Sequence, residues 1–189
     1  MIYLRLLISS VCFLLFFHSG CAKKEQSEHS SQSVGGSVEN VAAVISVEPR
    51  PGKAANFSWK DESGKTMSLD SYRGKVTLIN FWATWCGPCK HELPDLVELS
   101  KQFSNSNVKF IGVSVDRGPN IIEDVRAFVK EQAIPYQNVL ATDELVDAYG
   151  NIRMIPTSFL LDADGIIVQT LVGLRSKEFL TNSIQALLK

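Results

Sequence analysis

The sequence has little cysteine, no excess of charge of either sign and no long hydrophobic run. Four cysteines in 189 residues are too few for a small domain held together by disulfides. A formal net charge of −1 removes the basic footprint that nucleic-acid-binding domains carry. Charged residues at 21% beside 45% hydrophobic residues exclude a wholly disordered chain. The length fits one domain with an appendage.

The most apolar stretch of the chain lies at its N-terminus. Leu6 to Phe17 is a run of twelve residues, interrupted only by Ser9 and Ser10, whereas a membrane-spanning helix needs about 20 apolar residues. A signal-peptide core needs roughly 7–15. With the positive charge of Arg5 before the run, residues 1–20 are interpreted as an export signal. An uncleaved membrane anchor is the alternative.

Small residues precede the second cysteine, in the order Ser19-Gly20-Cys21. This segment resembles the lipobox of bacterial lipoproteins, in which the signal is cut before the Cys and the Cys is acylated. The resemblance departs at His18, where that family usually has an aliphatic residue, and a cut after Ala22 is the competing site. We expect lipidation of Cys21, and more than one acyl chain would make the anchoring stable. The domain would then lie in the cell envelope, on the periplasmic or extracytoplasmic face of a membrane.

Residues 21–49 are interpreted as a flexible linker. Ser, Gly, Gln and Glu dominate its first half, and periodicity is absent. Val41 to Val47 is a small apolar exception that could pack on the domain. Residues 50–189 hold 16 basic and 16 acidic side chains and are long enough to bury a sizeable core. They form the predicted domain.

The predicted domain alternates strand and helix signals. The expected strands are 57–60 and 66–69 as a hairpin, 76–82, 108–115, a short one at 139–140, and 157–161 and 166–172 as a second hairpin. The expected helices are 86–103 with a bend at Pro94, 121–132 capped by Asn120, 143–149 ended by Gly150, and one capped by Ser176 that runs to Leu188. This order predicts an α/β fold with a mixed sheet, part parallel and part antiparallel, flanked by helices.

The segment Trp82-Ala-Thr-Trp-Cys-Gly-Pro-Cys89 follows a predicted buried strand and opens a helix. Cys86 would lie at the helix N-terminus, where unpaired N–H groups and the macrodipole lower a thiol pKa below its usual value of about 8.5. Pro88 is tolerated in the first turn. Cys89 would lie on the same face one turn later and could close a disulfide. The pattern predicts that Cys86 attacks a substrate disulfide and that Cys89 resolves the mixed disulfide.

A metal site and a structural disulfide are the alternatives for this cysteine pair. Zinc usually takes four Cys or His ligands, and His91 alone does not complete a site because no second pair has suitable spacing. A structural disulfide needs neither a helix start nor a flanking Trp-x-x-Trp. We therefore expect redox catalysis, with no metal and no cofactor.

Residues 50–189 resemble the thioredoxin fold, and more closely its extracytoplasmic TlpA/ResA-type branch. FWATWCGPCK matches the active-site segment, and Met154-Ile155-Pro156-Thr157 matches the family's loop with a cis-proline. The resemblance implies an N-terminal β-hairpin and a central helical insert within residues 114–137. It also implies a substrate groove lined by Trp85, Gly87, Pro88, Ile155, Pro156 and Gly173. From the residues alone, Pro156 could be trans, Gly173 could mark a bend, and Trp85 could be a core or partly exposed aromatic.

Two further positions bear on proton transfer. Thioredoxin has a buried Asp two residues before the first Trp of the motif, where this chain has Asn80, which cannot accept the proton of Cys89. In the ResA-type branch a Glu three residues after the second Cys matters instead, and here that residue is Glu92. The resemblance implies a partly buried Glu92 with a raised pKa that exchanges a proton with Cys89. An exposed helical Glu is the alternative.

The resemblance implies an extracytoplasmic, lipid-anchored thiol–disulfide oxidoreductase that acts mainly as a reductant, with apocytochrome c among its candidate substrates. Because ResA has Glu between its cysteines and this chain has Gly87, fine substrate specificity does not carry over. The expected partners are disulfide-containing exported proteins and, since exported compartments are kept oxidising, a membrane thiol reductase as electron donor. A disulfide oxidant or isomerase and a non-catalytic binding module stay open. A peroxidase is disfavoured, because its reactive Cys would be expected in a different motif.

Overall fold

The computed structural model describes residues 40–188. The predicted signal (1–20), Cys21 and the first part of the predicted linker lie outside the described residues. The strands are β1 Val41–Glu48, β2 Asn56–Lys60, β3 Thr66–Ser68, β4 Val76–Trp82, β5 Val108–Ser114, β6 Gln137–Leu140, β7 Thr157–Leu161 and β8 Ile167–Val172. The helices are α1 Gly87–Gln102, α2 Ile121–Glu131, α3 Asp143–Ala148 and α4 Lys177–Leu187, with a short 3₁₀ helix η1 at Leu69–Tyr72. No helix in this part of the chain is long and apolar enough to cross a membrane.

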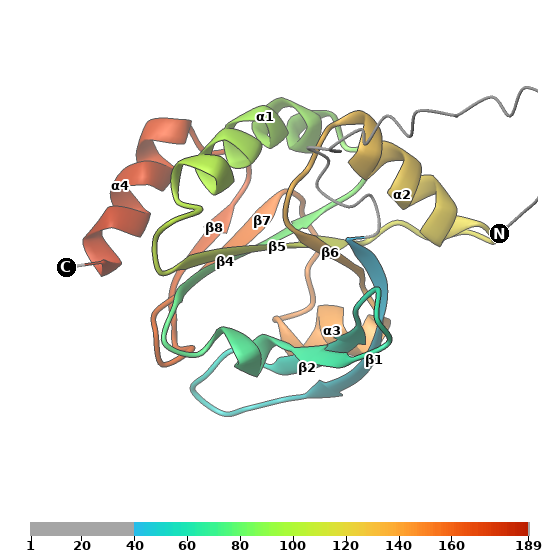
Figure 1. Ribbon diagram of the computed structural model, residues 1–189, viewed down its shortest axis with the longest axis horizontal. Helices are drawn as coiled ribbons and strands as arrows, with labels where there is room; N and C mark the ends of the chain where they lie inside the picture. The colour runs from blue at the N-terminus through green and yellow to red at the C-terminus, as the bar shows by residue number, and fades with distance from the viewer. Residues whose placement is uncertain (1–39, 189) are drawn as a thin grey trace, which may run out of the picture. The chain divides into compact units, whose positions relative to one another are not determined.

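The eight strands form one mixed sheet in the order β3-β2-β1-β6-β5-β4-β7-β8 (Figure 1). Strand β4 pairs in parallel with β5 and antiparallel with β7, and all seven of its residues are buried. A strand covered on both faces has to be apolar along its whole length, which explains the uninterrupted run VTLINFW. The predicted mixed sheet is confirmed, and its central strand leads directly into the cysteine motif.

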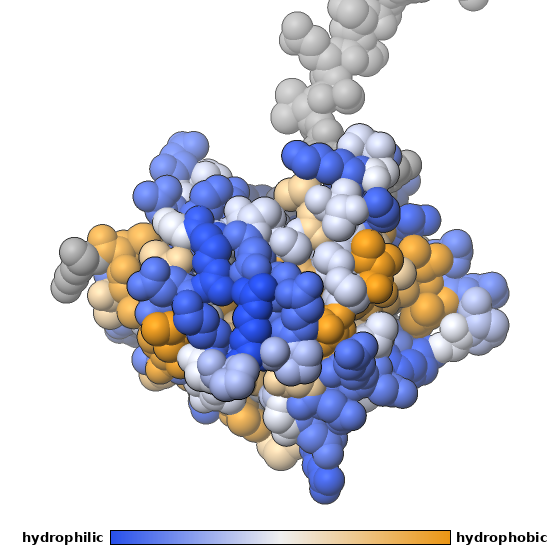
Figure 2. Space-filling view, turned by 90° about the horizontal axis from the view of Figure 1, so that it is seen from below, coloured by the Kyte–Doolittle hydropathy of each residue, from blue (hydrophilic) through white to orange (hydrophobic). Residues whose placement is uncertain are grey.

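Helices cover both faces of the sheet. Figure 1 shows α1, α2 and α4 on one face, and α3 with the β2 hairpin on the other. Successive side chains of β4 point to opposite faces, so Leu78 packs in the core under α1 while Ile79 and Phe81 pack in the core over α3. Figure 2 views the molecule from the hairpin side, where hydrophilic residues occupy most of the centre of the surface. Asn80 falls on the α1 face by the same alternation.

Strand β1 corrects the predicted boundary between linker and domain. Residues 41–48 were assigned to the linker, yet they form a strand whose first residues pair in parallel with β6 and whose last residues pair antiparallel with β2. Val41 at its start is only 1% exposed. Because the strand changes partner midway, its burial does not alternate regularly, and periodicity could not reveal it. The folded domain therefore begins by Asn40 and not at residue 50.

Asn40 ties β1 to the central insert that separates β5 from β6. Its Nδ2 donates to the carbonyl oxygens of Ile134 at 2.9 Å and Tyr136 at 2.7 Å, and Nε2 of Gln137 donates to the carbonyl of Asn40 at 3.1 Å. Helix α2 of the insert packs against β1. The insert expected within residues 114–137 thus exists, and the N-terminal strand fixes its end.

The predicted helix caps have different outcomes. Ser176 caps α4 as expected, because its Oγ accepts the N–H of Phe179 at 3.3 Å. Asn120 precedes α2 but its side chain makes no capping hydrogen bond, so that prediction is wrong. Its ψ of 30° lies outside the extended region that aims a capping side chain at the first turn. Helix α1 continues through Pro94, which lies on its exposed face.

Candidate active site

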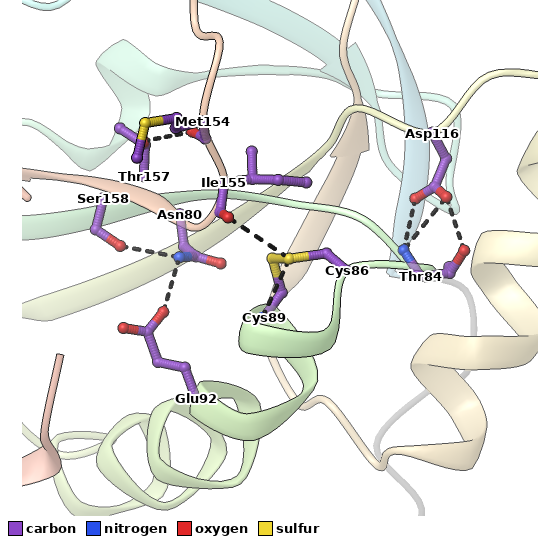
Figure 3. The surroundings of a disulfide bond; sticks show 10 residues. All are labelled: Asn80, Thr84, Cys86, Cys89, Glu92, Asp116, Met154, Ile155, Thr157 and Ser158. Atoms are coloured by element: carbon purple, nitrogen blue, oxygen red, sulfur yellow. Dashed lines mark hydrogen bonds between the residues drawn. A yellow bond between two sulfur atoms is a disulfide. The ribbon is translucent and has the colours of Figure 1, made fainter. Parts of the chain in front are cut away.

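The cysteine pair lies where β4 ends and α1 begins. A disulfide joins Cys86, the N-cap residue of α1, to Cys89 in the first turn (Figure 3). The backbone N–H of Cys89 donates to Sγ of Cys86 at 3.2 Å, and Pro88 occupies a position at which the helix needs no N–H. The sulfur of Cys86 therefore lies at the helix N-terminus, as the sequence predicts. This environment stabilises a thiolate.

Access to the disulfide is restricted, while its neighbours in the sequence are open to solvent. Cys86 and Cys89 are each 5% exposed, whereas Gly87 and Pro88 are exposed and Trp85 is 67% exposed. The core alternative for Trp85 is therefore wrong. A protein that approaches the disulfide would meet the indole of Trp85 at the surface.

The loop before β7 faces the cysteines. The Ile155–Pro156 peptide bond is cis, so the trans alternative is wrong. The carbonyl oxygen of Ile155 lies 3.7 Å from Sγ of Cys86 (Figure 3), and in the reduced protein it is placed to accept the S–H of Cys86. Pro156 itself is buried, and Ile155 is half-buried.

Gly173 lies beside this loop at the end of β8. Its N–H donates to the carbonyl of Pro156 at 2.8 Å, and its φ of +82° is a conformation that glycine adopts at little cost. A Cβ placed there would meet no atom within 4 Å. The backbone bend thus accounts for a glycine here, and a role in a substrate groove stays a prediction.

Glu92 lies on the buried face of α1, together with Cys89, Leu93, Leu96 and Leu99. The carboxyl is only 2% exposed, more deeply buried than the partly buried side chain expected, and the exposed alternative is wrong. Its Oε1 accepts the backbone N–H of Arg175 at 2.8 Å, and its Oε2 lies 3.4 Å from the donor Nδ2 of Asn80. The helix therefore carries a buried carboxyl three residues after the second cysteine.

Burial sets the protonation chemistry of Glu92. Desolvation raises the pKa of this carboxyl, while the hydrogen bonds from Arg175 and Asn80 act in the opposite direction. Nδ2 of Asn80 also donates to Oγ of Ser158 at 2.9 Å, so Asn80 links the carboxyl to β7 (Figure 3). A carboxyl with a raised pKa can hold a proton at a higher pH than an exposed one.

A second buried carboxylate near the cysteines was not found by the sequence analysis. Asp116 is 4% exposed and follows the end of β5. It accepts the backbone N–H of Thr84 at 3.0 Å, the hydroxyl of Thr84 at 2.7 Å and the hydroxyl of Ser114 at 2.7 Å. A Ser-x-Asp segment at the carboxyl end of a predicted buried strand was the available signal. Asp116 thus fixes the chain just before Cys86.

The described residues contain no cluster of side chains suited to hold a metal ion. Among residues 40–188, no group of three or more His, Cys, Asp or Glu side chains is arranged to hold a metal ion. His91 and Lys90, next to the second cysteine, are both exposed.

Comparison with known proteins identifies the family to which this chain belongs. Residues 51–170 match the AhpC/TSA family. The thiol-disulfide oxidoreductase ResA of Bacillus subtilis (strain 168) is 34% identical over 121 residues, which cover 64% of this chain and 65% of that protein, slightly less than two thirds of its length.

Solved structures give the same result. A thiol:disulfide interchange protein of the thioredoxin family from Chlorobium tepidum TLS superposes with a TM-score of 0.66 at 36% identity, over 74% of this chain and 98% of the other. StoA from Bacillus subtilis superposes with a TM-score of 0.57 at 32% identity, over 70% of this chain and 98% of the other. The expected thioredoxin-like fold is confirmed, and the chain belongs to the AhpC/TSA family, as a relative of the ResA-type thiol–disulfide oxidoreductases.

Proposed function

We propose that this chain reduces disulfides in exported proteins through Cys86 and Cys89. The observation that carries the proposal is the placement of Cys86, at the N-terminus of α1 and opposite the cis-proline loop, within disulfide distance of Cys89. ResA and the Chlorobium protein are named for thiol–disulfide chemistry. The match to the AhpC/TSA family covers residues 51–170, a range that includes both cysteines.

The reaction starts from the reduced protein. The thiolate of Cys86 attacks one sulfur of the substrate disulfide, and the other substrate sulfur leaves as a thiolate that takes up a proton. The thiolate of Cys89 then attacks the sulfur of Cys86 and releases the second substrate thiol. Two electrons have passed from the dithiol to the substrate, and the protein holds the disulfide described above. A membrane thiol reductase would return the dithiol.

Glu92 is our candidate for the group that takes the proton of Cys89 before the second step. Its burial, its raised pKa and its place on the same helical face as Cys89 support this role. The test is the titration of Cys89 in the wild type and in Glu92→Gln. A shifted Cys89 titration in the variant is expected, and superimposable curves would remove Glu92 from the mechanism.

The substrate groove is proposed to consist of the surface around Cys86, with Trp85, Gly87, Pro88, Ile155, Pro156 and Gly173 as its lining. The side chains of Trp85 and of Met154, which is 62% exposed, offer apolar contact to a substrate at the surface. Apocytochrome c is one candidate among exported substrates. No residue of this chain selects it over other disulfide-containing proteins.

Export and anchoring complete the proposal. The signal at residues 1–20 and acylation of Cys21 would tether the domain to the outer face of a membrane, in the compartment where such substrates occur. Mass spectrometry of the protein from a membrane fraction tests this part. A diacyl or triacyl Cys21 as the new N-terminus is expected, and an unmodified Cys21 thiol would contradict it.

The direct test of the redox role traps partners in cells. Cys89→Ser cannot resolve a mixed disulfide, so partners should accumulate on Cys86, and the double variant Cys86→Ser, Cys89→Ser is the matched control. Exported proteins and a membrane thiol reductase should be recovered from the single variant only. Equal recovery from both variants, or full thiol-exchange activity in Cys86→Ala, would instead favour a binding module with a structural disulfide.

A further inference from the structure

The segment that connects β4 to the first cysteine is held by an acidic side chain from the neighbouring strand. Residues Ala83 to Trp85 have no partner strand, and Thr84 in their middle is fixed by Asp116, which follows β5. Both oxygens of the carboxylate lie within hydrogen-bond distance of the backbone N–H of Thr84, at 3.2 and 3.0 Å. Figure 3 shows this contact two residues before Cys86.

The side-chain carboxylate of Asp116 accepts every hydrogen bond that it makes. The hydroxyl of Thr84 donates to Oδ1 at 2.7 Å and the hydroxyl of Ser114 donates to Oδ2 at 2.7 Å. The backbone N–H of Asp116 in turn donates to Oγ of Ser114 at 3.2 Å. An ionised carboxylate can only accept hydrogen bonds, and the Asp116 side chain is surrounded by donors alone.

The charge of Asp116 has no ion-pair partner among residues 40–188. In Arg117, the nearest cation in the sequence, Nη2 donates a hydrogen bond to Asp143 at 2.8 Å and Nη1 donates to backbone carbonyls. A buried charge that is hydrogen-bonded but not paired retains a long-range field, because little solvent screens it. Cys86 lies two residues beyond Thr84 in the chain and is itself only 5% exposed, so little solvent would screen such a field at its sulfur.

We propose that Asp116 is a positioning residue of the redox site, which fixes the chain before Cys86 through Thr84 and whose negative charge makes the dithiol a stronger reductant. A like charge nearby disfavours the thiolate of Cys86. A dithiol whose thiolate is disfavoured is less stable in the reduced state, and it gives up its electrons more readily. Asp116 thus opposes the helix N-terminus, which favours the thiolate.

Other ionisable groups lie on the elements that surround Cys86, besides Cys89 itself. Nearest in sequence are Lys90, His91 and Glu92 on α1, Arg117 after β5, Arg153 before β7 and Arg175 after β8. Helix α1 carries Asp95, Glu98 and Lys101 farther along. The cations among them act in the same direction as the helix N-terminus. Variants at Asp116 leave all of these groups in place, so a change in redox behaviour can be assigned to Asp116.

The test is the equilibrium of the Cys86–Cys89 pair with reduced and oxidised glutathione, in the protein without its signal, for the wild type and Asp116→Asn. Asn keeps the shape and loses the charge. The equilibrium constant should move toward the reduced protein by about tenfold, which corresponds to ~30 mV for a two-electron couple. Alkylation of the reduced protein with iodoacetamide across pH should show a lower pKa of Cys86.

Two controls separate the charge from a general structural effect. Asp124→Asn removes an exposed carboxylate from α2 and should leave the equilibrium unchanged. Ser114→Ala keeps the charge of Asp116 and removes one donor, so the dithiol should become more reducing, opposite to Asp116→Asn. If Asp116→Asn does not fold, the same glutathione equilibrium is measured for Ser114→Ala and for Asp116→Ser, which also removes the charge.

The inference is overturned if Asp116→Asn matches the wild type, moves the equilibrium toward the oxidised protein, or shifts it no more than Asp124→Asn. It rests on the redox role proposed for the cysteines. The glutathione equilibrium can nevertheless be measured whatever the physiological substrate is, so trapping could fail to find partners while this result stands.

Discussion

Glu92 differs from the other acidic residues of α1 in that its carboxyl lies inside the protein. The raised pKa means that the folded protein keeps the proton over a pH range in which the unfolded chain, with a value near 4.5, has lost it. The stabilisation that goes with protonated Glu92 is therefore complete below pH ~4.5 and disappears as the pH rises through the folded-state pKa.

Glu92→Gln removes this dependence because Gln stays neutral. The free energy of unfolding of the variant, relative to the wild type, should increase as the pH rises through that range, by ~1.4 kcal/mol for each unit by which the pKa is raised. Urea unfolding between pH 4 and pH 8, with exposed Glu123→Gln on α2 as control, measures it. A difference that is flat with pH would show that burial does not perturb Glu92.

At the residue scale, local sequence motifs predicted much of the site. Contacts between residues far apart in the sequence could not be predicted. The helix start fixes Cys86, Cys89 and Pro88, and the spacing of the two cysteines allows the disulfide that the structure contains. The family resemblance implied a partly buried Glu92, whereas the residues alone left an exposed Glu open, and the side chain is buried. Asp116 could not be connected with Thr84 in advance, because their contact depends on which strands are neighbours.

Strand β5 carries a glycine whose missing side chain makes room for two others. A Cβ at Gly112 would lie 1.9 Å from Oδ1 of Asn138 on β6 and 2.8 Å from Nε1 of Trp82 on β4. Gly112→Ala should therefore lower the free energy of unfolding by about 1–3 kcal/mol. Gly87→Ala, whose Cβ would meet nothing within 4 Å, is the matched control.

The cause of that loss can be isolated with a second substitution. In the double variant Gly112→Ala, Asn138→Ala, the destabilisation should be smaller than the sum of the two single effects, because the clash at Asn138 is gone. Chemical denaturation of all four proteins measures this coupling. Additive losses would mean that Trp82 or the backbone, and not Asn138, resists the added Cβ.

Strand β1 joins the N-terminal hairpin to the rest of the sheet, so its removal should cost stability. A chain that begins at Asn40 should unfold at the same urea concentration as a longer one, whereas a chain that begins at Arg50 loses Val41 and Val44 from the core. We expect a loss of at least about 3 kcal/mol, comparable to a large buried truncation. Equal stabilities would show that the predicted linker boundary was adequate after all.

At the element scale, the bounds of elements whose burial pattern is uniform along their length could be predicted from the sequence. Strand β4 has the predicted bounds, because burial on both faces leaves a continuous apolar run. The boundary at β1 was missed because its two halves have different partners. The cap at Asn120 was missed because residue type alone does not fix the backbone angles.

For the whole molecule, the order of strands and helices and the cysteine motif together predicted the fold and the family. The near-zero net charge of residues 50–189 gives the domain no strong field of its own. Direction of electron flow is thus a property of the site, where the helix N-terminus and the Asp116 carboxylate act in opposite directions on Cys86.

The reduction potential of the Cys86–Cys89 pair tests the central claim most directly. It can be measured by equilibrating the protein without its signal with glutathione, or with dithiothreitol where the potential is too low. A reductant should have a potential in the region of thioredoxin, about −270 mV. A potential near that of a strong oxidant such as DsbA, about −120 mV, would contradict the assignment of this protein as a reductant.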